Sequence, residues 1–534
     1  MITYEIKALI RGVIVSLQKN RIFPEFEIPE IVIDCPANKE YGDFSTGVVL
    51  KLGKYFSQEP STTAKVLRDR LAKAEIFSKV EVAGPGFINF FISPKYLHNK
   101  VKEVLKQKGK FGTVNLGKNR KVNVEFISAN PTGPLTLGNG RGGFCGDVLS
   151  KVLSKAGYKV TKEHYINDRG EQIIKLGHSV LRDEQAVYKG EYIEELNKHI
   201  KGLSAQAESN PELIGDKAAE YILEKMMKPA VARMGIKFDV WFSEKKLYDG
   251  GWVDKTIADL TRRGFTYRSE GATWFKSKDL GDDKDRVLIR KDGVKTYFAS
   301  DIAYLKNKIS RGFEKIILFV GADHHGYINR LKAAGHTLSF NKENIDVVVM
   351  QLVQLFKDGK EFKMSKRAGT YVTLDELLDE VSLDVARFFF LQRASTTHLN
   401  FDLNLAKEQS QKNPVYYIQY AHARICSIIK KTGILLRLRT PNFELLKDQT
   451  ELNLINQVIR LPEVVQETAM DYQVQRLTQY ATELADAFHN FYEKCHVITK
   501  DKKLSSARLS LILATKIVLK NTLDLMGISS PEKM

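Results

Sequence analysis

The sequence predicts a multidomain α/β protein, in which a small α+β domain precedes a Rossmann-like parallel-sheet domain and an α-helical bundle follows it. Three observations support this class. The chain has 534 residues, enough for about three or four units of ordinary size. A strand, a glycine-rich loop, a helix and a second strand follow one another over residues 121–166. After about residue 405 strand patterns give way to amphipathic helical patterns.

The first domain is expected over residues 1–105. Two helical stretches are followed by KVEVAGPGFINFFIS, whose apolar runs lie on both sides of Gly84-Pro85-Gly86 and predict a β-hairpin. A lysine-rich connector, KEVLKQKGKFGTVNLGKNRK, then leads to the second domain, which is expected over residues 115–400.

The second domain begins with a βαβ unit. KVNVEFISA is predicted as a buried strand, NPTGPLTLGNG as a loop, RGGFCGDVLSKVLSKAGY as a helix and KVTKEHYI as a second strand, which implies a parallel sheet. Further strands are predicted at 314–322 and 345–355. The long, mostly helical stretch between the two strand pairs exceeds what a crossover needs, so we expect a helical insertion at roughly 180–290. The helical bundle should occupy residues 405–534.

Composition narrows the class of protein. Hydrophobic residues make up 43% and charged residues 27%, as in soluble globular proteins. No apolar run has the length of a membrane helix, and the N-terminal pattern does not suggest a signal peptide, so a cytoplasmic location is expected.

The four cysteines are far apart and fit reduced thiols better than a zinc knuckle or disulfide framework. The net charge of +18 is spread along the chain, which suits either a folded RNA partner or a merely basic surface.

The glycine turn allows two nucleotide hypotheses. Gly138, Gly140 and Gly143 have the spacing of a dinucleotide-binding turn, and a loop of this kind at a helix N-terminus can hold phosphate. Glu163 follows about 20 residues later, where a dehydrogenase would place the acidic partner of a ribose. On these residues alone, a nicotinamide-dependent dehydrogenase remains possible.

A second charged loop favours a different nucleotide. Lys363-Met364-Ser365-Lys366 follows the last predicted strand, in the stretch KDGKEFKMSKRAGTYVTL. Two lysines and a serine at the carboxyl end of a parallel sheet could stabilise a triphosphate as it loses pyrophosphate. A dehydrogenase has no use for such a loop.

Several motifs, taken in order, resemble a known family. NPTGPLTLGNGRGG, EHYINDRGEQI, YFASDIAY, VGADHHGYINRLKAA, KMSKRAGT and NPVYYIQYAHARIC together resemble a class I aminoacyl-tRNA synthetase, specifically an arginyl-tRNA synthetase of bacterial type. The similarity extends over essentially the whole chain. It implies an arginine–tRNA ligase that forms arginyl-adenylate from arginine and ATP and then charges tRNA(Arg), with activation that generally needs bound tRNA.

The resemblance implies an ATP site with one departure from the family. The first signature, usually His-x-Gly-His, is Thr136-Leu137-Gly138-Asn139 here, so two neutral side chains that can donate hydrogen bonds replace two histidines. Thr136, Asn139, Lys363 and Lys366 are the expected catalytic residues. The expected ATP-binding residues are Pro131, Thr132, Gly133, Pro134, Leu135, Thr136, Leu137, Gly138, Asn139, Gly321, Lys363, Met364, Ser365 and Lys366.

The resemblance also implies an arginine site. Tyr297 and Asp301 share a helix face at i, i+4, and a carboxylate beside a phenol suits a guanidinium, although surface ion pairing is the alternative for Asp301 or Glu244 alone. Tyr165, Asn167 and Asp168 end the second strand, where a ligand crevice is expected. The expected arginine-binding residues are Glu125, Ser128, Asn130, Glu244, Tyr297, Asp301 and His324.

No resident metal or permanently bound cofactor is expected. His324-His325 has no third ligand placed by the sequence, and Mg²⁺ should arrive with ATP, which is a substrate. The protein is expected to be a monomer without membrane contact.

The resemblance implies that the bundle recognises the anticodon. Tyr417, Tyr420 and Arg424 follow the helix start at Asn413-Pro414 and could stack on unpaired bases, although such a stripe is more often core. A synthetase for another amino acid and a non-catalytic RNA-binding relative remain the alternatives.

Overall fold

The N-terminal part is a small α+β domain. The computed structural model describes the whole chain except residues 1, 37, 202–209, 323–325, 363–370 and 433–440. The first elements are α1 (Ile2–Lys19), η1 (Lys39–Tyr41), β1 (Phe44–Thr46), α2 (Val48–Leu52), η2 (Gly53–Tyr55), α3 (Pro60–Leu71), β2 (Phe77–Ala83), β3 (Phe87–Ile92), α4 (Pro94–Gln107) and η3 (Lys108–Lys110). Antiparallel pairing of β2 with β3 confirms the predicted hairpin, and β1 joins β3 on its other side.

The second domain is built on a five-stranded sheet in the order β11-β10-β4-β5-β6, in which all neighbours are parallel. Its elements are β4 (Lys121–Glu125), α5 (Leu137–Lys155), β5 (Lys159–Ile166), β6 (Val240–Ser243), β10 (Lys315–Gly321) and β11 (Ile345–Met350). The predicted βαβ unit is therefore confirmed as β4-α5-β5. The helix ends where Gly157 takes the left-handed conformation, with φ of 88°.

Both faces of this sheet are covered. Alternate residues of β10 belong to separate apolar clusters, because successive side chains of a strand point to opposite faces. Ile317 and Phe319 pack in the cluster that contains α5. Ile316 and Leu318 pack in the cluster that contains α12 (Tyr297–Ser310) and α13 (Tyr327–Thr337).

The stretch between β5 and β10 is helical only in part. It contains α6 (Glu171–Leu181), α7 (Glu191–Lys201), α8 (Pro211–Tyr221), a π-helical turn η4 (Ile222–Met227), α9 (Lys228–Arg233), α10 (Lys245–Asp249), α11 (Trp252–Arg262), β7 (Thr266–Ser269), β8 (Ala272–Phe275), η5 (Lys278–Leu280) and β9 (Arg286–Ile289). The strands β7, β8 and β9 form a separate antiparallel sheet, and β6 extends the central one. The sequence did not reveal these strands because each has four residues and little regular alternation.

The single strand predicted at 345–355 is wrong, because two strands of different sheets occupy it. The following elements are η7 (Lys342–Asn344), β12 (Val353–Lys357), β13 (Lys360–Glu361), α14 (Leu374–Glu380), α15 (Leu383–Leu391), β14 (Leu399–Asp402) and α16 (Leu403–Lys407). The chain leaves the central sheet at Gln351, whose N–H donates to the carbonyl of Ser395 and whose carbonyl accepts from buried Arg141. Beyond that point β12 pairs with β13 and β14.

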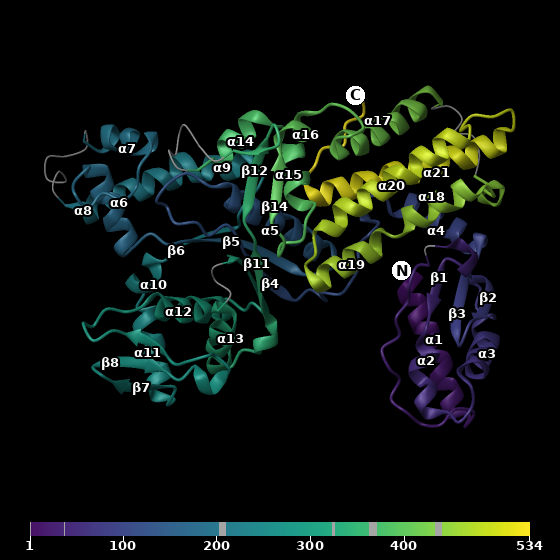
Figure 1. Cartoon of the computed structure of the whole chain (residues 1–534), viewed down its shortest axis with the longest axis horizontal. Coiled ribbons are helices and arrows are strands. Elements are labelled where there is room, and N and C mark those ends of the chain that lie inside the picture. Colours follow the sequence, from purple (N-terminus) through teal and green to yellow (C-terminus); the bar gives the residue numbers. More distant parts are fainter. Residues whose placement is uncertain (1, 37, 202–209, 323–325, 363–370, 433–440) are drawn as a thin grey trace.

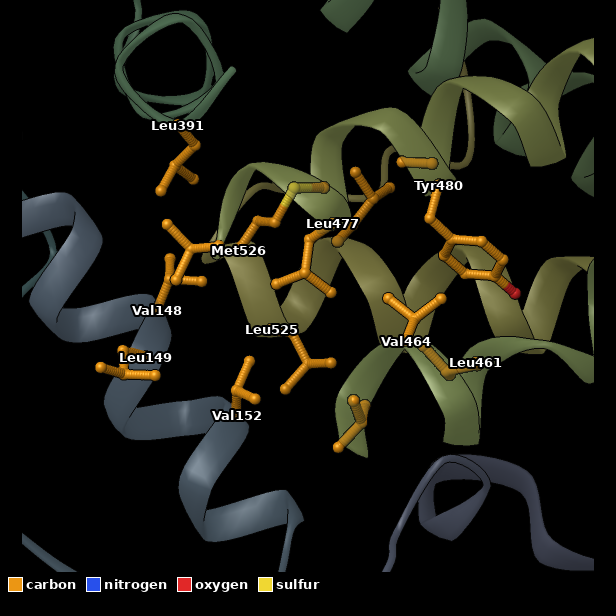
Figure 2. Packing of buried hydrophobic residues seen from close by; sticks show 14 of the residues in the cluster. Val148, Leu149, Val152, Leu391, Leu461, Val464, Leu477, Tyr480, Leu525 and Met526 are labelled. Atoms are coloured by element: carbon orange, nitrogen blue, oxygen red, sulfur yellow. The ribbon is translucent and has the colours of Figure 1, made fainter. Parts of the chain in front are cut away.

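The last part of the described chain is helical and packs directly on the sheet domain. Its elements are α17 (Pro414–Thr432), η9 (Phe443–Leu445), α18 (Gln449–Ile459), α19 (Leu461–Asp471), α20 (Gln475–Lys494) and α21 (Lys502–Met526). In Figure 1 these helices lie beside α5 and above the N-terminal domain. Figure 2 shows the core that α5 and α15 share with the bundle, formed by Val148, Leu149, Val152, Leu391, Leu461, Val464, Leu477, Tyr480, Leu525 and Met526.

Polar contacts fix these parts to one another. The Arg387 guanidinium bonds to Asp147 at 3.0 Å and to the carbonyls of Met234 and Met526, so it joins α15 to α5, to the end of α9 and to the end of α21. The side chain of Glu463 in α19 accepts from the N–H and hydroxyl of Thr3, at 2.6 and 2.7 Å. The N-terminal domain is thereby anchored on the bundle.

Candidate active site

A cavity of about 1010 Å³ lies at the carboxyl edge of the central sheet. Its lining includes Ser128 after β4, Tyr165 near the end of β5, Glu244 after β6 and Gly321 at the end of β10. The sheet order reverses here, because β5 lies on one side of β4 and β10 on the other. This is the position at which open α/β sheets bind ligands.

The structure brings together most of the predicted site residues that it describes. Those that line the cavity are Glu125, Ser128, Asn130, Thr132, Gly133, Pro134, Thr136, Asn139, Glu244, Tyr297, Asp301 and Gly321. Pro131, Leu135 and Leu137 are instead buried in the packing around the glycine turn, and Gly138 is exposed. The predicted residues His324, Lys363, Met364, Ser365 and Lys366 lie outside the described residues.

The end of β4 has an unusual backbone. Ile127 and Ser128 have φ angles of 65° and 40°, values that residues other than glycine rarely adopt. The turn places the Ser128 hydroxyl 3.0 Å from Glu125 Oε1, to which it donates, and 3.1 Å from the N–H of Tyr165, from which it accepts. Backbone strain of this kind often accompanies functional sites.

Glu125 is already paired. Its carboxylate forms a salt bridge with Lys308 of α12, whose side chain is 1% exposed, in addition to the bond from Ser128. A cationic group that approached Glu125 would therefore meet a carboxylate whose charge is already balanced.

Asp301 and Glu244 offer negative charge to the cavity, and neither forms a salt bridge with a described residue. Burial raises the pKa of Asp301 to about 7, and the charge of Glu244 adds to this effect while a hydrogen bond from Tyr327 opposes it. Burial also raises the pKa of Glu244, which is 2% exposed and whose Oε2 has no hydrogen-bond partner in the described part of the chain. Two such carboxylates favour a cationic ligand, whose charge would lower both pKa values.

Thr136 and Asn139 bond to each other at the N-terminus of α5. Asn139 Oδ1 accepts from the N–H and the hydroxyl of Thr136, each at 2.9 Å, and the Thr136 hydroxyl accepts from the N–H of Asn139 at 3.2 Å. This reciprocal arrangement is a capping box, which satisfies N–H groups that an α-helix leaves unpaired. The Asn139 amide NH₂ makes no bond to a described residue and remains available to a ligand.

The glycine turn is joined to the segment that follows the lysine loop (Lys363-Met364-Ser365-Lys366). Thr136 pairs with Thr373 in an antiparallel bridge, and the N–H of Leu374 donates to the carbonyl of Leu135 at 2.8 Å. A Cβ at Gly140 would lie 2.7 Å from Leu374 Cδ1, so glycine is required there for close packing. Residues far apart in sequence, around 136 and 373, thus meet at one edge of the cavity.

Glu163 does not serve a ribose. It is fully buried, its two oxygens accept from Arg311 at 2.6 and 2.8 Å, and Asn123 and Tyr304 also donate to it. Burial by itself favours the neutral acid, but the Arg311 and Tyr304 hydrogen bonds hold the pKa of Glu163 below its usual value. The dehydrogenase hypothesis loses the acidic residue on which it depended.

Several lining residues were not predicted, namely Gln172, Lys189, Tyr192, Tyr327, Arg330 and Tyr371. The hydroxyls of Tyr192 and Tyr371 donate to the carbonyls of Thr132 and Pro134, at 3.0 and 3.2 Å, and so cover the glycine turn. No spacing rule connects these two tyrosines with residues so distant in sequence.

Three residues were predicted at the end of the second strand. Of these, Tyr165 and Asn167 line the cavity, whereas Asp168 accepts hydrogen bonds from Ser243 and from the N–H of Lys245.

The predicted anticodon residues lie on α17, away from the cavity. The ring of Tyr417 packs 4.6 Å from His489, and the guanidinium of Arg424 lies 5.5 Å from the ring of Tyr420. Both tyrosines are partly exposed and Arg424 is exposed. They combine packing with an accessible aromatic and cationic surface.

Family models match most of the chain. They are the arginyl tRNA synthetase N terminal domain over residues 4–92, the class I (R) tRNA synthetase catalytic domain over 100–389 and the DALR anticodon binding domain over 418–534. Within the described part of the chain, none of the helices has the length and apolar character that a bilayer crossing requires.

Similar proteins agree with these models. Proteins named arginine–tRNA ligase from Moorella thermoacetica and Syntrophotalea carbinolica are each 43% identical, over 95% of this chain and 94% and 95% of their own lengths. The solved arginyl-tRNA synthetase of Thermus thermophilus has the same fold, with a TM-score of 0.81, 23% identity and full coverage of both chains. The chain therefore belongs to the arginyl-tRNA synthetase family of class I aminoacyl-tRNA ligases.

Proposed function

We propose that this protein joins L-arginine to tRNA(Arg), with conversion of ATP to AMP and diphosphate. The observation that carries the proposal is the single cavity that Glu244 and Asp301 line together with the glycine turn. The two carboxylates suit a cationic amino acid, and the glycine turn at the helix N-terminus suits a nucleotide phosphate. Relatives of nearly the same length that are named arginine–tRNA ligase support this assignment.

In the first step, a carboxylate oxygen of arginine attacks the α-phosphorus of ATP. The bond from that phosphorus to the bridging oxygen breaks, and diphosphate leaves with the electron pair. The positive end of α5 and the free amide NH₂ of Asn139 stabilise phosphate charge, with Lys363 and Lys366 proposed for the leaving group. Binding both substrates in one cavity supplies much of the remaining acceleration through orientation.

In the second step, a ribose hydroxyl of the terminal tRNA nucleotide attacks the arginyl carbonyl. The ester forms, the hydroxyl proton is released, and AMP leaves with the oxygen that joined carbonyl to phosphate. No covalent bond to the protein is involved. The exposed Tyr420 and Arg424 surface is proposed to hold the anticodon, which would fix the tRNA at a second point.

The proposal includes Mg²⁺ bound mainly through ATP. Phosphate oxygens and water are the usual ligands of Mg²⁺ in nucleotide sites. In the described part of the chain, no group of three or more His, Cys, Asp or Glu side chains has a metal-binding arrangement. We further propose a monomeric protein of the cytoplasm.

Two variants should separate the roles of the two halves of the site. Lys366→Ala should lower the rate of ATP–pyrophosphate exchange in the presence of tRNA by about 100-fold, with little change in the KM for arginine. Asp301→Ala should raise the KM for arginine by at least about 100-fold, because it removes a buried charge partner. Lys360→Ala, an exposed change on β13, is the matched control. Equal losses in rate and arginine affinity in both variants would contradict this division.

A further inference from the structure

Two amide side chains in the cavity have acceptor oxygens without partners. Asn167 Oδ1 and Gln172 Oε1 are buried, line the same cavity as Glu244 Oε2, and like it accept no hydrogen bond from a described residue. Buried polar atoms are usually paired, and an unpaired one costs free energy. Three unpaired acceptors around one cavity indicate a ligand that is rich in N–H donors.

Asn167 lies beside Glu244. In the parallel pair β5 and β6, Ile166 is opposite Ser243, so the next residues, Asn167 and Glu244, are neighbours at the carboxyl edge. The Glu244 N–H donates to the Ile166 carbonyl at 2.9 Å. On the other side of the asparagine, Asp168 accepts from Ser243 and from the N–H of Lys245, so bonds hold both neighbours of Asn167.

The turn that precedes Gln172 lies close to Tyr297. Gln172 is the second residue of α6, after Gly170, which has a φ of 82°. A Cβ added at Gly170 would lie 3.9 Å from the Tyr297 hydroxyl, so this turn passes directly over the tyrosine. Asn167 thus neighbours Glu244, and Gln172 follows a turn that lies against Tyr297. Both Glu244 and Tyr297 are predicted side-chain ligands of arginine, and all four residues line the same cavity.

We propose that the amide oxygens of Asn167 and Gln172 complete the acceptor set for the guanidinium of arginine, and thereby contribute to amino-acid specificity. This inference rests on the proposed function. A guanidinium has five N–H donors in one plane and no acceptor. Glu244 and Asp301 balance its charge, and two amide oxygens supply further acceptors without a third negative charge. The ammonium of lysine, with three donors at one point, cannot reach acceptors spread over such a surface.

The paired variants Gln172→Leu and Gln172→Glu test the acceptor role, with Asn167→Leu and Asn167→Asp as a second pair. Leucine removes the acceptor, whereas glutamate keeps one. Aminoacylation kinetics at about pH 8.5 should give a KM for arginine about 10- to 100-fold higher in Gln172→Leu and within about threefold of the wild type in Gln172→Glu. The KM for ATP should stay within about twofold in both. Gln449→Leu, at an exposed position of α18, is the control.

Each other outcome would overturn the inference. An unchanged KM for arginine in both leucine variants would exclude a contact with the substrate side chain. Equal loss in the glutamate and leucine variants would mean that the amide donates, and a selective rise in the KM for ATP would assign it to the nucleotide. Thermal unfolding midpoints identify a variant that fails to fold, in which case the other pair decides. Failure of the proposed function is distinct, since the wild-type protein would then not charge arginine.

Discussion

Asp301 combines a position in the proposed arginine site with a pKa of about 7, so its ionisation changes within the range of ordinary assay buffers. The ionised form is the one that can pair with a guanidinium, which itself stays charged at all these pH values. The KM for arginine should therefore be constant above about pH 8 and rise by about tenfold between pH 8 and pH 6. Steady-state aminoacylation at several pH values measures this dependence.

The matched variant for this pH dependence is Asp301→Asn, which cannot ionise. Its KM for arginine should be high and nearly independent of pH over the same range. A wild-type KM that does not change between pH 6 and 8 would contradict the role assigned to Asp301.

Thr136 and Asn139, at the positions where the resemblance implies histidines, form a hydrogen-bonded pair. The double variant Thr136→Val with Asn139→Ala removes the capping box and the free amide donor together. We expect adenylate formation to fall by about 100-fold or more, and the free energy of unfolding to fall by about 1 kcal/mol. Tryptophan fluorescence during urea unfolding and tRNA-dependent pyrophosphate exchange measure the two effects.

Thr136→Ser is the control for this change, because serine keeps the hydroxyl and should retain most activity. If the double variant activated arginine normally, backbone N–H groups and the lysine loop would be sufficient to hold ATP.

Among the elements of the described chain, α5 contacts strands and helices of the sheet domain as well as helices of the bundle. Asp147 in this helix is 1% exposed and pairs with Arg387, Lys151 and Lys162, and Arg387 is itself 1% exposed. Asp147→Ala would leave the buried Arg387 guanidinium without its carboxylate, which should lower the free energy of unfolding by about 3–5 kcal/mol. Lys151→Ala, which removes only the partly exposed partner, should cost less than about 1 kcal/mol. Similar unfolding midpoints for the two variants would contradict this assignment.

The elements also show how far sequence patterns can predict this fold. The βαβ unit, the hairpin and the C-terminal helices follow from local periodicity and glycine positions, and all are present. The change of sheet at Gln351 depends on a carbonyl contact from Arg141 and a backbone bond to Ser395, both distant in sequence. Local sequence patterns do not reveal such long-range contacts, so the apolar run at 345–355 was predicted as one strand.

The site shows the same limit. Glycine spacing identified the glycine turn, and the resemblance to arginyl-tRNA synthetases identified Glu244, Tyr297 and Asp301. The fold places all of them around one cavity. The sequence could not show that Lys308 neutralises Glu125, since that depends on how α12 packs on β4. Nor could it show that Thr136 and Asn139 bond mainly to each other.

At the scale of the whole molecule, the sheet domain, the bundle and the N-terminal domain each have a feature that suits contact with one large substrate. The cavity lies in the sheet domain, and the aromatic and cationic surface lies on α17. The N-terminal domain is anchored to the bundle through Thr3 and Glu463. A net charge of +18 spread over these parts favours contact with a polyanion at several places.

The most direct test of the central claim is ATP-dependent charging of tRNA with each of the twenty labelled amino acids. The account predicts that arginine is attached to tRNA(Arg), that AMP and diphosphate appear in equal amounts, and that no other amino acid is attached at a comparable rate. Efficient attachment of a different amino acid, or tRNA binding without any charging, would contradict it.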